Sequence, residues 1–152
     1  MSCDIRQATL ADLEVLVPLF DAYRRFYRLE GDLDGARQFL RDRFERNESV
    51  VFLAHDLAHE GGAAVGFTQL YPAFSSGAMA RTFILNDLFV APHARRRGAG
   101  SALLQAAADY GRRSGAVRLV LATEITNTTA QSVYDRLGWK RDTTFCAYQL
   151  TL

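Results

Sequence analysis

Three arginines and two glycines stand close together in the hexapeptide Arg-Arg-Arg-Gly-Ala-Gly at residues 95–100. Glycines let backbone N–H groups approach a ligand closely, and the first turn of a following helix leaves its own N–H groups unpaired, with partial positive charge. Arginine side chains add fork-shaped donors that fit phosphate oxygens. The segment therefore predicts an anion-binding turn, and a diphosphate is the guest that it fits best.

Two familiar phosphate motifs do not fit this turn. The chain has no G-x-G-x-x-G after a strand, as dinucleotide sites have, and no G-x-x-x-x-G-K-[ST], as nucleoside triphosphate sites have. The pattern that fits is [Q/R]-x-x-G-x-[G/A]. Two other readings stay open, a solvated basic turn that caps a helix and a patch for nucleic acid. The formal net charge of +1 argues against a general polyanion binder.

The residues on either side of the turn predict a strand and a helix that hold it in place. Residues 82–90 are apolar, β-branched or aromatic except for Asn86 and Asp87, so they predict a largely buried strand. Residues 98–114 repeat apolar side chains at helical spacing and predict a helix, which Gly115 ends. The order is strand, basic glycine-rich turn, helix.

The rest of the chain alternates between helical and strand patterns, and Thr9 with Asp12 can cap the first helix. The further expected elements are strands at residues 3–8, 50–54, 64–71 and 117–122, helices at 10–27, 36–46 and 126–137, a turn at 72–80, and last strands at 139–140 and 143–150. This order predicts an α/β domain with a mixed sheet.

Size and composition predict one soluble domain, residues 1–152. No stretch reaches the roughly 18 apolar residues of a membrane span, and the N-terminus lacks a signal peptide's apolar region, so we expect a cytoplasmic protein. Cys3 and Cys146 have no metal-binding spacing, and no metal is expected. His55 and His59, near two glycines, are interpreted with His93 as solvated loop or surface residues, with a metal pair as the alternative.

Three motifs together resemble the GNAT superfamily of acetyl-CoA-dependent N-acetyltransferases. They are D-L-F-V-x-P at residues 87–92, the turn at 95–100, and N-x₆-Y-x₃-G-[FW] at 127–139. The resemblance implies a mostly antiparallel sheet with splayed central strands and about four flanking helices. It also implies transfer of an acetyl group from acetyl-CoA to a primary amine of a small molecule, amino acid or peptide, by direct attack in a ternary complex, and a homodimer.

The same resemblance assigns a set of cofactor-binding residues. The backbone of the strand is expected to pair with the pantetheine arm, the turn to bind the diphosphate through its amides, and the later helix to contact the arm. These residues are Leu88, Phe89, Val90, Arg95, Arg96, Arg97, Gly98, Ala99, Gly100, Ser101, Asn127 and Tyr134.

Three residues are candidates for proton transfer. By resemblance, the Tyr134 hydroxyl protonates the departing thiolate, since a phenol is still protonated at neutral pH. Asp87 and Glu124, at the ends of the two splayed strands, are candidates for the base that takes the ammonium proton. Some amine-acetylating relatives carry an acid where this chain has Asn86, and peptide-acetylating relatives carry a glutamate where it has Ala122.

Acceptor choice is expected to lie with the first two helices and the turn at residues 72–80. An aromatic and basic cluster at the end of the first helix, residues 23–28, is interpreted mostly as core and solvated charge, with one or two side chains on the substrate. Two other functions stay open. The chain could bind acyl-CoA as a sensor without catalysis, or bind nucleic acid through Arg95–Arg97.

Overall fold

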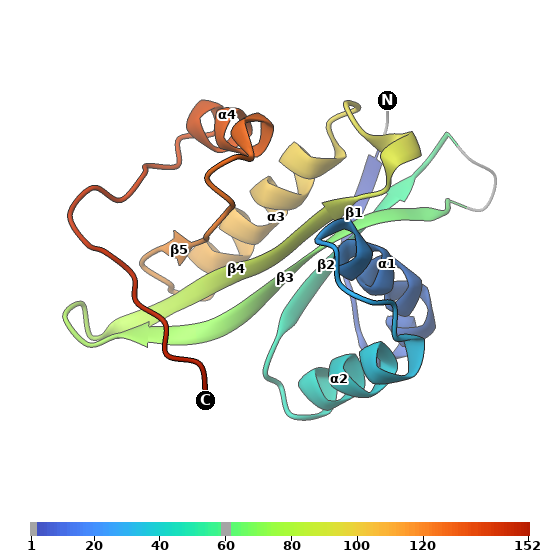
Figure 1. Ribbon diagram of the computed structural model, residues 1–152, viewed down its shortest axis with the longest axis horizontal. Coiled ribbons are helices and arrows are strands. Elements are labelled where there is room, and N and C mark those ends of the chain that lie inside the picture. Colours follow the sequence, from blue (N-terminus) through green and yellow to red (C-terminus); the bar gives the residue numbers. More distant parts are fainter. Residues whose placement is uncertain (1–2, 59–61) are drawn as a thin grey trace. The chain divides into compact units, whose positions relative to one another are not determined.

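The structure, a computed structural model, describes residues 3–58 and 62–152 (Figure 1). His59, one half of the alternative metal pair, lies outside these residues. The chain forms two compact units, unit 1 (Met1–Ala122) and unit 2 (Thr123–Leu152), and each is described by itself. No helix in the described part of the chain has the length and hydropathy to cross a membrane, and no group of three metal-ligating side chains occurs there.

Unit 1 is built on a five-stranded sheet with strands in sequence order, β1-β2-β3-β4-β5. The strands are β1 (Cys3–Gln7), β2 (Val50–Asp56), β3 (Ala64–Ser75), β4 (Ala80–Val90) and β5 (Leu119–Val120). The first three pairings are antiparallel and only β4 and β5 run parallel. The expected mixed, mostly antiparallel sheet is thus confirmed.

The helices begin and end close to the positions that capping chemistry predicts. The Thr9 side chain accepts from the Ala11 amide, and Asp12 caps the backbone of Thr9 in return, which starts a 3-10 turn at Leu10–Asp12. It is followed by α1 (Leu13–Phe26), α2 (Leu33–Glu45), a second 3-10 turn (Pro92–Ala94) and α3 (Ala99–Arg113). Unit 2 holds one helix, α4 (Thr128–Arg136).

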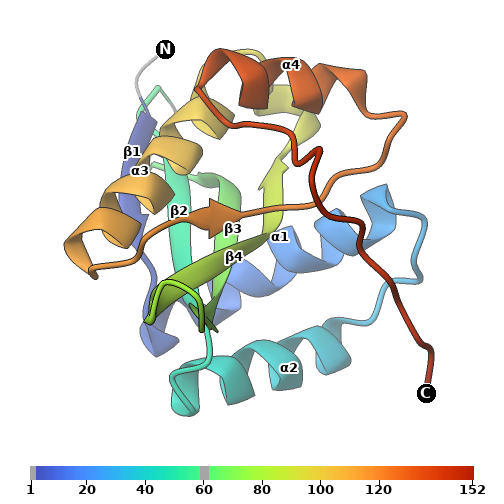
Figure 2. The same ribbon diagram turned by 90° about the vertical axis from the view of Figure 1, so that its left-hand side faces the viewer.

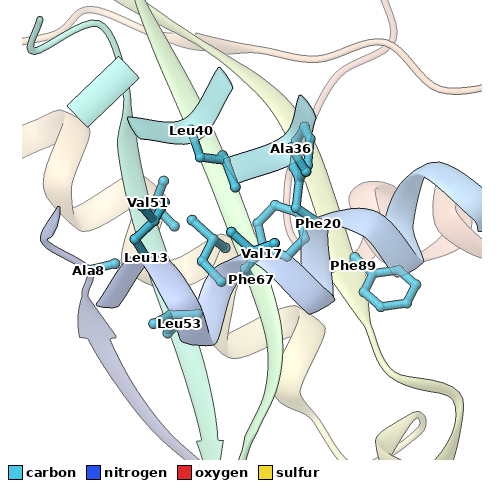
Figure 3. Packing of buried hydrophobic residues seen from close by; sticks show 11 residues of the cluster. Ala8, Leu13, Val17, Phe20, Ala36, Leu40, Val51, Leu53, Phe67 and Phe89 are labelled. Atoms are coloured by element: carbon cyan, nitrogen blue, oxygen red, sulfur yellow. The ribbon is translucent and has the colours of Figure 1, made fainter. Parts of the chain in front are cut away.

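Alternation along the strands gives unit 1 a core on each face of the sheet. Val51 and Leu53 of β2 face α1 and α2, while Phe52 and Ala54 face α3, so this strand is buried on both sides. Figure 2 shows unit 1 from the side, with its helices on both faces of the sheet. On the first face, the α1 and α2 side chains pack around the fully buried Phe67 of β3 (Figure 3).

The central strands β4 and β5 diverge, as expected. Their pairing covers only Phe83 with Leu119 and Ile84 with Val120, whereas β4 runs on to Val90. In the part of the chain that the structure describes, residues 85–90 therefore have no strand partner on the β5 side. This leaves one edge of β4 with unpaired backbone groups, the kind of edge to which an extended ligand can add.

Three expectations for individual segments are wrong. Residues 139–140 and 143–150 form no strand, because a strand needs a hydrogen-bonded neighbour and unit 2 contains no other strand. The turn expected at 72–80 is shorter, since β3 continues to Ser75 and pairs with β4 across Pro72. His55 does not lie in a loop: it belongs to β2 and is half-buried.

Gly66 sets how closely β3 approaches β4. A Cβ atom at this position would lie 2.7 Å from the Phe89 carbonyl oxygen, a backbone atom that moves only if the strand moves. We therefore expect Gly66→Ala to lower the free energy of unfolding by about 1–3 kcal/mol, measured by urea unfolding. Gly77→Ala is the control, because a Cβ there meets no atom within 4 Å. Equal stability of the Gly66→Ala variant and the parent would contradict this strand spacing.

Candidate functional site

A β-bulge interrupts β4 beside the point where β5 diverges. Gln69 pairs with Asp87, but the next residue of β3, Leu70, pairs with Leu85, so Asn86 is the extra residue of β4. A bulge of this kind breaks the alternation of a strand and redirects side chains, and bulges are common next to active sites. The polar pair Asn86 and Asp87, which interrupts the apolar pattern of the sequence, therefore marks the bulge.

Asp87 is buried on the face of the sheet that α1 and α2 cover. The residue is 3% exposed, and neutral donors hold both of its carboxylate oxygens. Gln69 donates from Nε2 to Oδ2 at 2.6 Å, and Asn86 donates from Nδ2 to Oδ1 at 3.1 Å. Asp87 forms no ion pair with the described residues. A buried carboxylate without a counter-cation is costly, so the site favours a cationic ligand or a proton.

The environment of Asp87 favours its protonated form. Burial raises the pKa of Asp87 above its ordinary value, and hydrogen bonds from Gln69, Tyr23 and Asn86 lower it in part. Two tyrosines beside it respond to its charge. Burial, and then the Asp87 charge, raise the pKa of Tyr23 and of Tyr71 far above that of a free phenol. A carboxylate with a raised pKa is a stronger base than an exposed one, which suits it to accepting a proton.

Tyr23 reaches this carboxylate from the far end of α1. Its hydroxyl donates to the Asn86 carbonyl at 3.4 Å and lies within hydrogen-bonding reach of the Asp87 side chain. Its ring contacts those of Phe67 and Phe89 edge-on, at centroid distances of 5.9 and 6.4 Å. The sequence analysis assigned Tyr23 to an aromatic cluster but predicted no catalytic role for it, and it did not predict Gln69 as a site residue. The signal for Gln69 was a lone amide within an otherwise apolar strand.

The open edge of β4 presents the backbone of Leu88 and Val90. Below the bulge, Phe83 donates its amide to the Arg118 carbonyl on the β5 side. Beyond the bulge, Ala91 donates to the Val65 carbonyl of β3. Odd-numbered residues of β4 therefore direct their backbone groups toward β5 before the bulge and toward β3 after it. The backbone groups of Leu88 and Val90 therefore face the edge that β5 leaves open. Phe89, predicted with them as a cofactor contact, directs its backbone toward β3 and its ring into the core.

The basic turn leads from β4 directly into the N-terminus of α3. Gly98 has φ = 89° and Arg96 φ = 63°, both in the left-handed region, and these two reversals bend the chain into the helix. The first backbone bond of α3 runs from the Ala102 amide to the Gly98 carbonyl at 3.0 Å. The amides of Ala99 and Gly100 thus donate to no backbone carbonyl of the described residues, as anion binding at a helix start requires.

Two of the three arginines in the turn have partners within unit 1. Arg95 donates from Nε to the Val90 carbonyl at 2.8 Å, and its guanidinium lies 4.9 Å from the Phe26 ring centroid. Arg97 lies 3.9 Å from the fully buried carboxylate of Asp56. Within residues 3–58 and 62–152, Arg96 makes no such contact. These contacts fix the turn against the sheet, and they leave the amides as its main anion donors.

Unit 2 holds the other three predicted residues. Asn127 caps α4, with its side-chain oxygen accepting from the Ala130 amide at 3.2 Å. The Tyr134 ring packs against Trp139 at a centroid distance of 6.0 Å. Glu124 is exposed in the segment before α4, and its carbonyl accepts from the Asn127 amide. Asn127 and Tyr134 therefore share one short helix, as their spacing predicted.

Comparisons with known proteins point to one family and one fold. The sequence model of the Acetyltransferase (GNAT) family matches residues 16–139. An uncharacterized N-acetyltransferase of Bacillus subtilis, YhfO, is 50% identical over 149 residues, which cover 98% of this chain and 97% of that protein. A crystal structure of a probable acetyltransferase is 43% identical with a TM-score of 0.91, and the match covers 98% of this chain and 97% of that one. The aminoglycoside N-acetyltransferase AAC(6')-Iy, solved in complex with CoA, shares the fold at 22% identity, with a TM-score of 0.80 and 99% and 96% of the chains covered.

Proposed function

Because the chain belongs to the acetyltransferase (GNAT) family and is an acyltransferase, we propose that it transfers the acetyl group of acetyl-CoA to a primary amine by direct attack in a ternary complex. One observation carries the proposal most strongly. A buried carboxylate without a counter-cation, Asp87, lies at a bulge beside the open edge of β4, the strand that leads into the basic turn at the start of α3. This arrangement supplies a proton acceptor near the place where an extended cofactor can bind.

The cofactor part of the proposal follows from the chemistry of the donor groups. The amides of Ala99 and Gly100 at the start of α3 suit the diphosphate of CoA. The backbone groups of Leu88 and the amide of Val90, whose carbonyl accepts from Arg95, suit the amide-containing pantetheine arm. The CoA complex of the aminoglycoside acetyltransferase with the same fold supports this choice. When bound, acetyl-CoA supplies a thioester, whose carbonyl carbon the amine attacks.

The proton accounting gives Asp87 and Tyr134 a role each. An amine reaches the enzyme mainly as its ammonium and must lose a proton before its lone pair can attack. We assign that proton to Asp87, because its raised pKa and burial suit a base, whereas Glu124 is exposed. Once the C–N bond forms and the C–S bond breaks, we assign the proton that the departing thiolate takes to the Tyr134 hydroxyl. The second proton that the nitrogen loses as it becomes an amide returns through solvent to the Tyr134 oxygen and restores the phenol.

Tyr134→Phe tests the acid and separates an enzyme from a sensor. The variant keeps the ring that packs against Trp139 and removes only the hydroxyl. We expect kcat to fall about 10- to 1,000-fold while acetyl-CoA affinity holds, because the donor acts in the transition state. Single-turnover kinetics with a good acceptor provide the measurement. A variant that turns over like the parent would show that Tyr134 does not donate the proton to the thiolate.

A screen of acceptors tests the proposed function itself. Wild-type protein, acetyl-CoA and panels of small amines, amino acids, aminoglycosides and peptide N-termini are mixed, and thiol release is followed. The proposal predicts release that depends on both substrates with at least one class of amine. Tight acetyl-CoA binding with no release from any panel would indicate a sensor. Binding of RNA that weakens steeply with salt would indicate the nucleic-acid function instead.

A further inference from the structure

Asp87 is almost completely shielded from solvent. Only 3% of the residue is exposed, and Gln69 and Asn86 already donate to its two carboxylate oxygens. The acceptor ammonium is a compact but strongly hydrated group, and the residues that bury Asp87 would have to move before it could contact this carboxylate directly. If Asp87 is the base, another group has to carry the proton across the last few ångströms.

Tyr23 is the side chain placed for this task. It is half-buried, so one side of the residue meets solvent while its hydroxyl lies within hydrogen-bonding reach of Asp87. The hydroxyl also donates to the Asn86 carbonyl at 3.4 Å, a length that leaves this bond weak. Ring contacts with Phe20, Phe67 and Phe89 hold the phenol in place. The hydroxyl is therefore fixed in position but not held by a strong hydrogen bond to the Asn86 carbonyl.

We propose that the Tyr23 hydroxyl passes the proton of the acceptor ammonium to Asp87, an inference that rests on the proposed acetyltransferase function. In this step the ammonium N–H bond breaks and its proton goes to the Tyr23 oxygen, while the Tyr23 O–H bond breaks and its proton goes to an Asp87 oxygen. The products are a neutral amine, an unchanged phenol and a protonated carboxyl group. Asp87 later returns its proton to solvent, so atoms and charges balance.

The surroundings favour a relay over a free phenolate. Burial and the Asp87 charge raise the pKa of Tyr23 so far that the phenolate is not populated, so the hydroxyl can act only by accepting and donating together. Gln69 and Tyr71 of β3 and Asn86 of β4 face Asp87 as well, and Arg43 of α2 acts on Tyr71. Of the two tyrosines, Tyr23 has its hydroxyl within hydrogen-bonding reach of Asp87, whereas Tyr71 feels only the charge of Asp87, so Tyr71 is a neighbour without this role.

The test compares Tyr23→Phe with its matched control Tyr71→Phe, and the wild-type protein is the reference. The acceptor is the amine that releases most thiol in the acceptor screen. We expect Tyr23→Phe to lower kcat/KM about 10- to 100-fold at neutral pH, with acetyl-CoA affinity unchanged, and Tyr71→Phe to stay close to the parent. Circular dichroism and thermal unfolding confirm that both variants are folded. A loss that is equal in both variants would overturn the relay.

The pH dependence distinguishes a relay from a packing defect. Above the acidic limb of the wild-type profile, the ratio of wild-type to Tyr23→Phe kcat/KM should fall as the pH approaches the pKa of the acceptor ammonium. There the amine arrives already neutral and needs no relay. A ratio that does not change with pH, or a Tyr23→Phe rate equal to the parent, would refute the role of Tyr23 and leave the proposed function standing. Absence of turnover in the wild-type protein would refute the proposed function instead.

Discussion

Asp87→Asn is expected to lower kcat/KM about 10²- to 10⁴-fold at neutral pH, the usual loss for one acid–base group. The amide has nearly the same shape but cannot take the ammonium proton. The fold should tolerate it, since the Gln69 Oε1 atom is buried without a partner among the described residues and a rotated Gln69 amide can accept from the new N–H. Initial rates with the best acceptor measure the effect, and acetyl-CoA affinity is the control. An unchanged rate would show that Asp87 is not the base.

The pH dependence of the same variant provides a second, independent test of Asp87 as the base. The wild-type rate should rise with pH through the folded pKa of Asp87, and this acidic limb should vanish in Asp87→Asn. Because the folded pKa lies above the ordinary value of about 3.9, the folded state binds more protons between these two values. The free energy of unfolding of the wild type should therefore fall as pH rises through that window, and the variant should lack this step. Parallel stability profiles would contradict the raised pKa.

Gly100→Asp is expected to weaken acetyl-CoA binding about 100- to 1,000-fold. Two unit charges about 4 Å apart repel by roughly 4 kcal/mol near a protein surface, and each 1.4 kcal/mol corresponds to a factor of about ten. The variant should remain folded, because a Cβ at Gly100 meets only a Val90 methyl group at 3.9 Å. An acid in the first turn of a helix is also favourable for the helix itself. Isothermal titration calorimetry measures the affinity.

Gly100→Ala is the matched control for this charge. It adds the same Cβ without the carboxylate, and alanine also fits the last position of the motif, so affinity should stay near the parent value. Gly98 is a poorer site for the test, because its φ of 89° strains any side chain and the turn itself would change. If Gly100→Asp bound acetyl-CoA as tightly as Gly100→Ala, the diphosphate would not bind at this turn.

Short-range sequence patterns were sufficient to predict the turn at residues 95–100 and the strand and helix on either side of it. Apolar runs bounded by glycine and proline, and the Thr9–Asp12 cap, predicted α1, α3 and β4 within a few residues of their observed limits. The polar pair Asn86 and Asp87 stood out because it interrupts an apolar strand. Each of these signals comes from residues that are close together in the sequence, and a sequence pattern records such local relations directly.

Contacts between distant segments could not be predicted in the same way. Tyr23 and the backbone of Asn86 are 63 residues apart and meet only because α1 packs across β3 and β4. Arg95 resembled a phosphate ligand in the sequence, yet it donates to Val90 and lies over the Phe26 ring. The last strands were predicted without knowledge of a pairing partner. The homodimer and the cytoplasmic location stay predictions.

The most direct measurement of the central claim follows the acetyl group by mass spectrometry. Wild-type protein is first mixed with acetyl-CoA alone, and the best acceptor amine is added in a second step. Direct attack predicts that the protein keeps its unmodified mass throughout, and that free CoA and N-acetylated amine then form in equal amounts. An acetylated protein that passes its acetyl group to the amine, or CoA release without any acetylated amine, would contradict direct transfer to an acceptor amine.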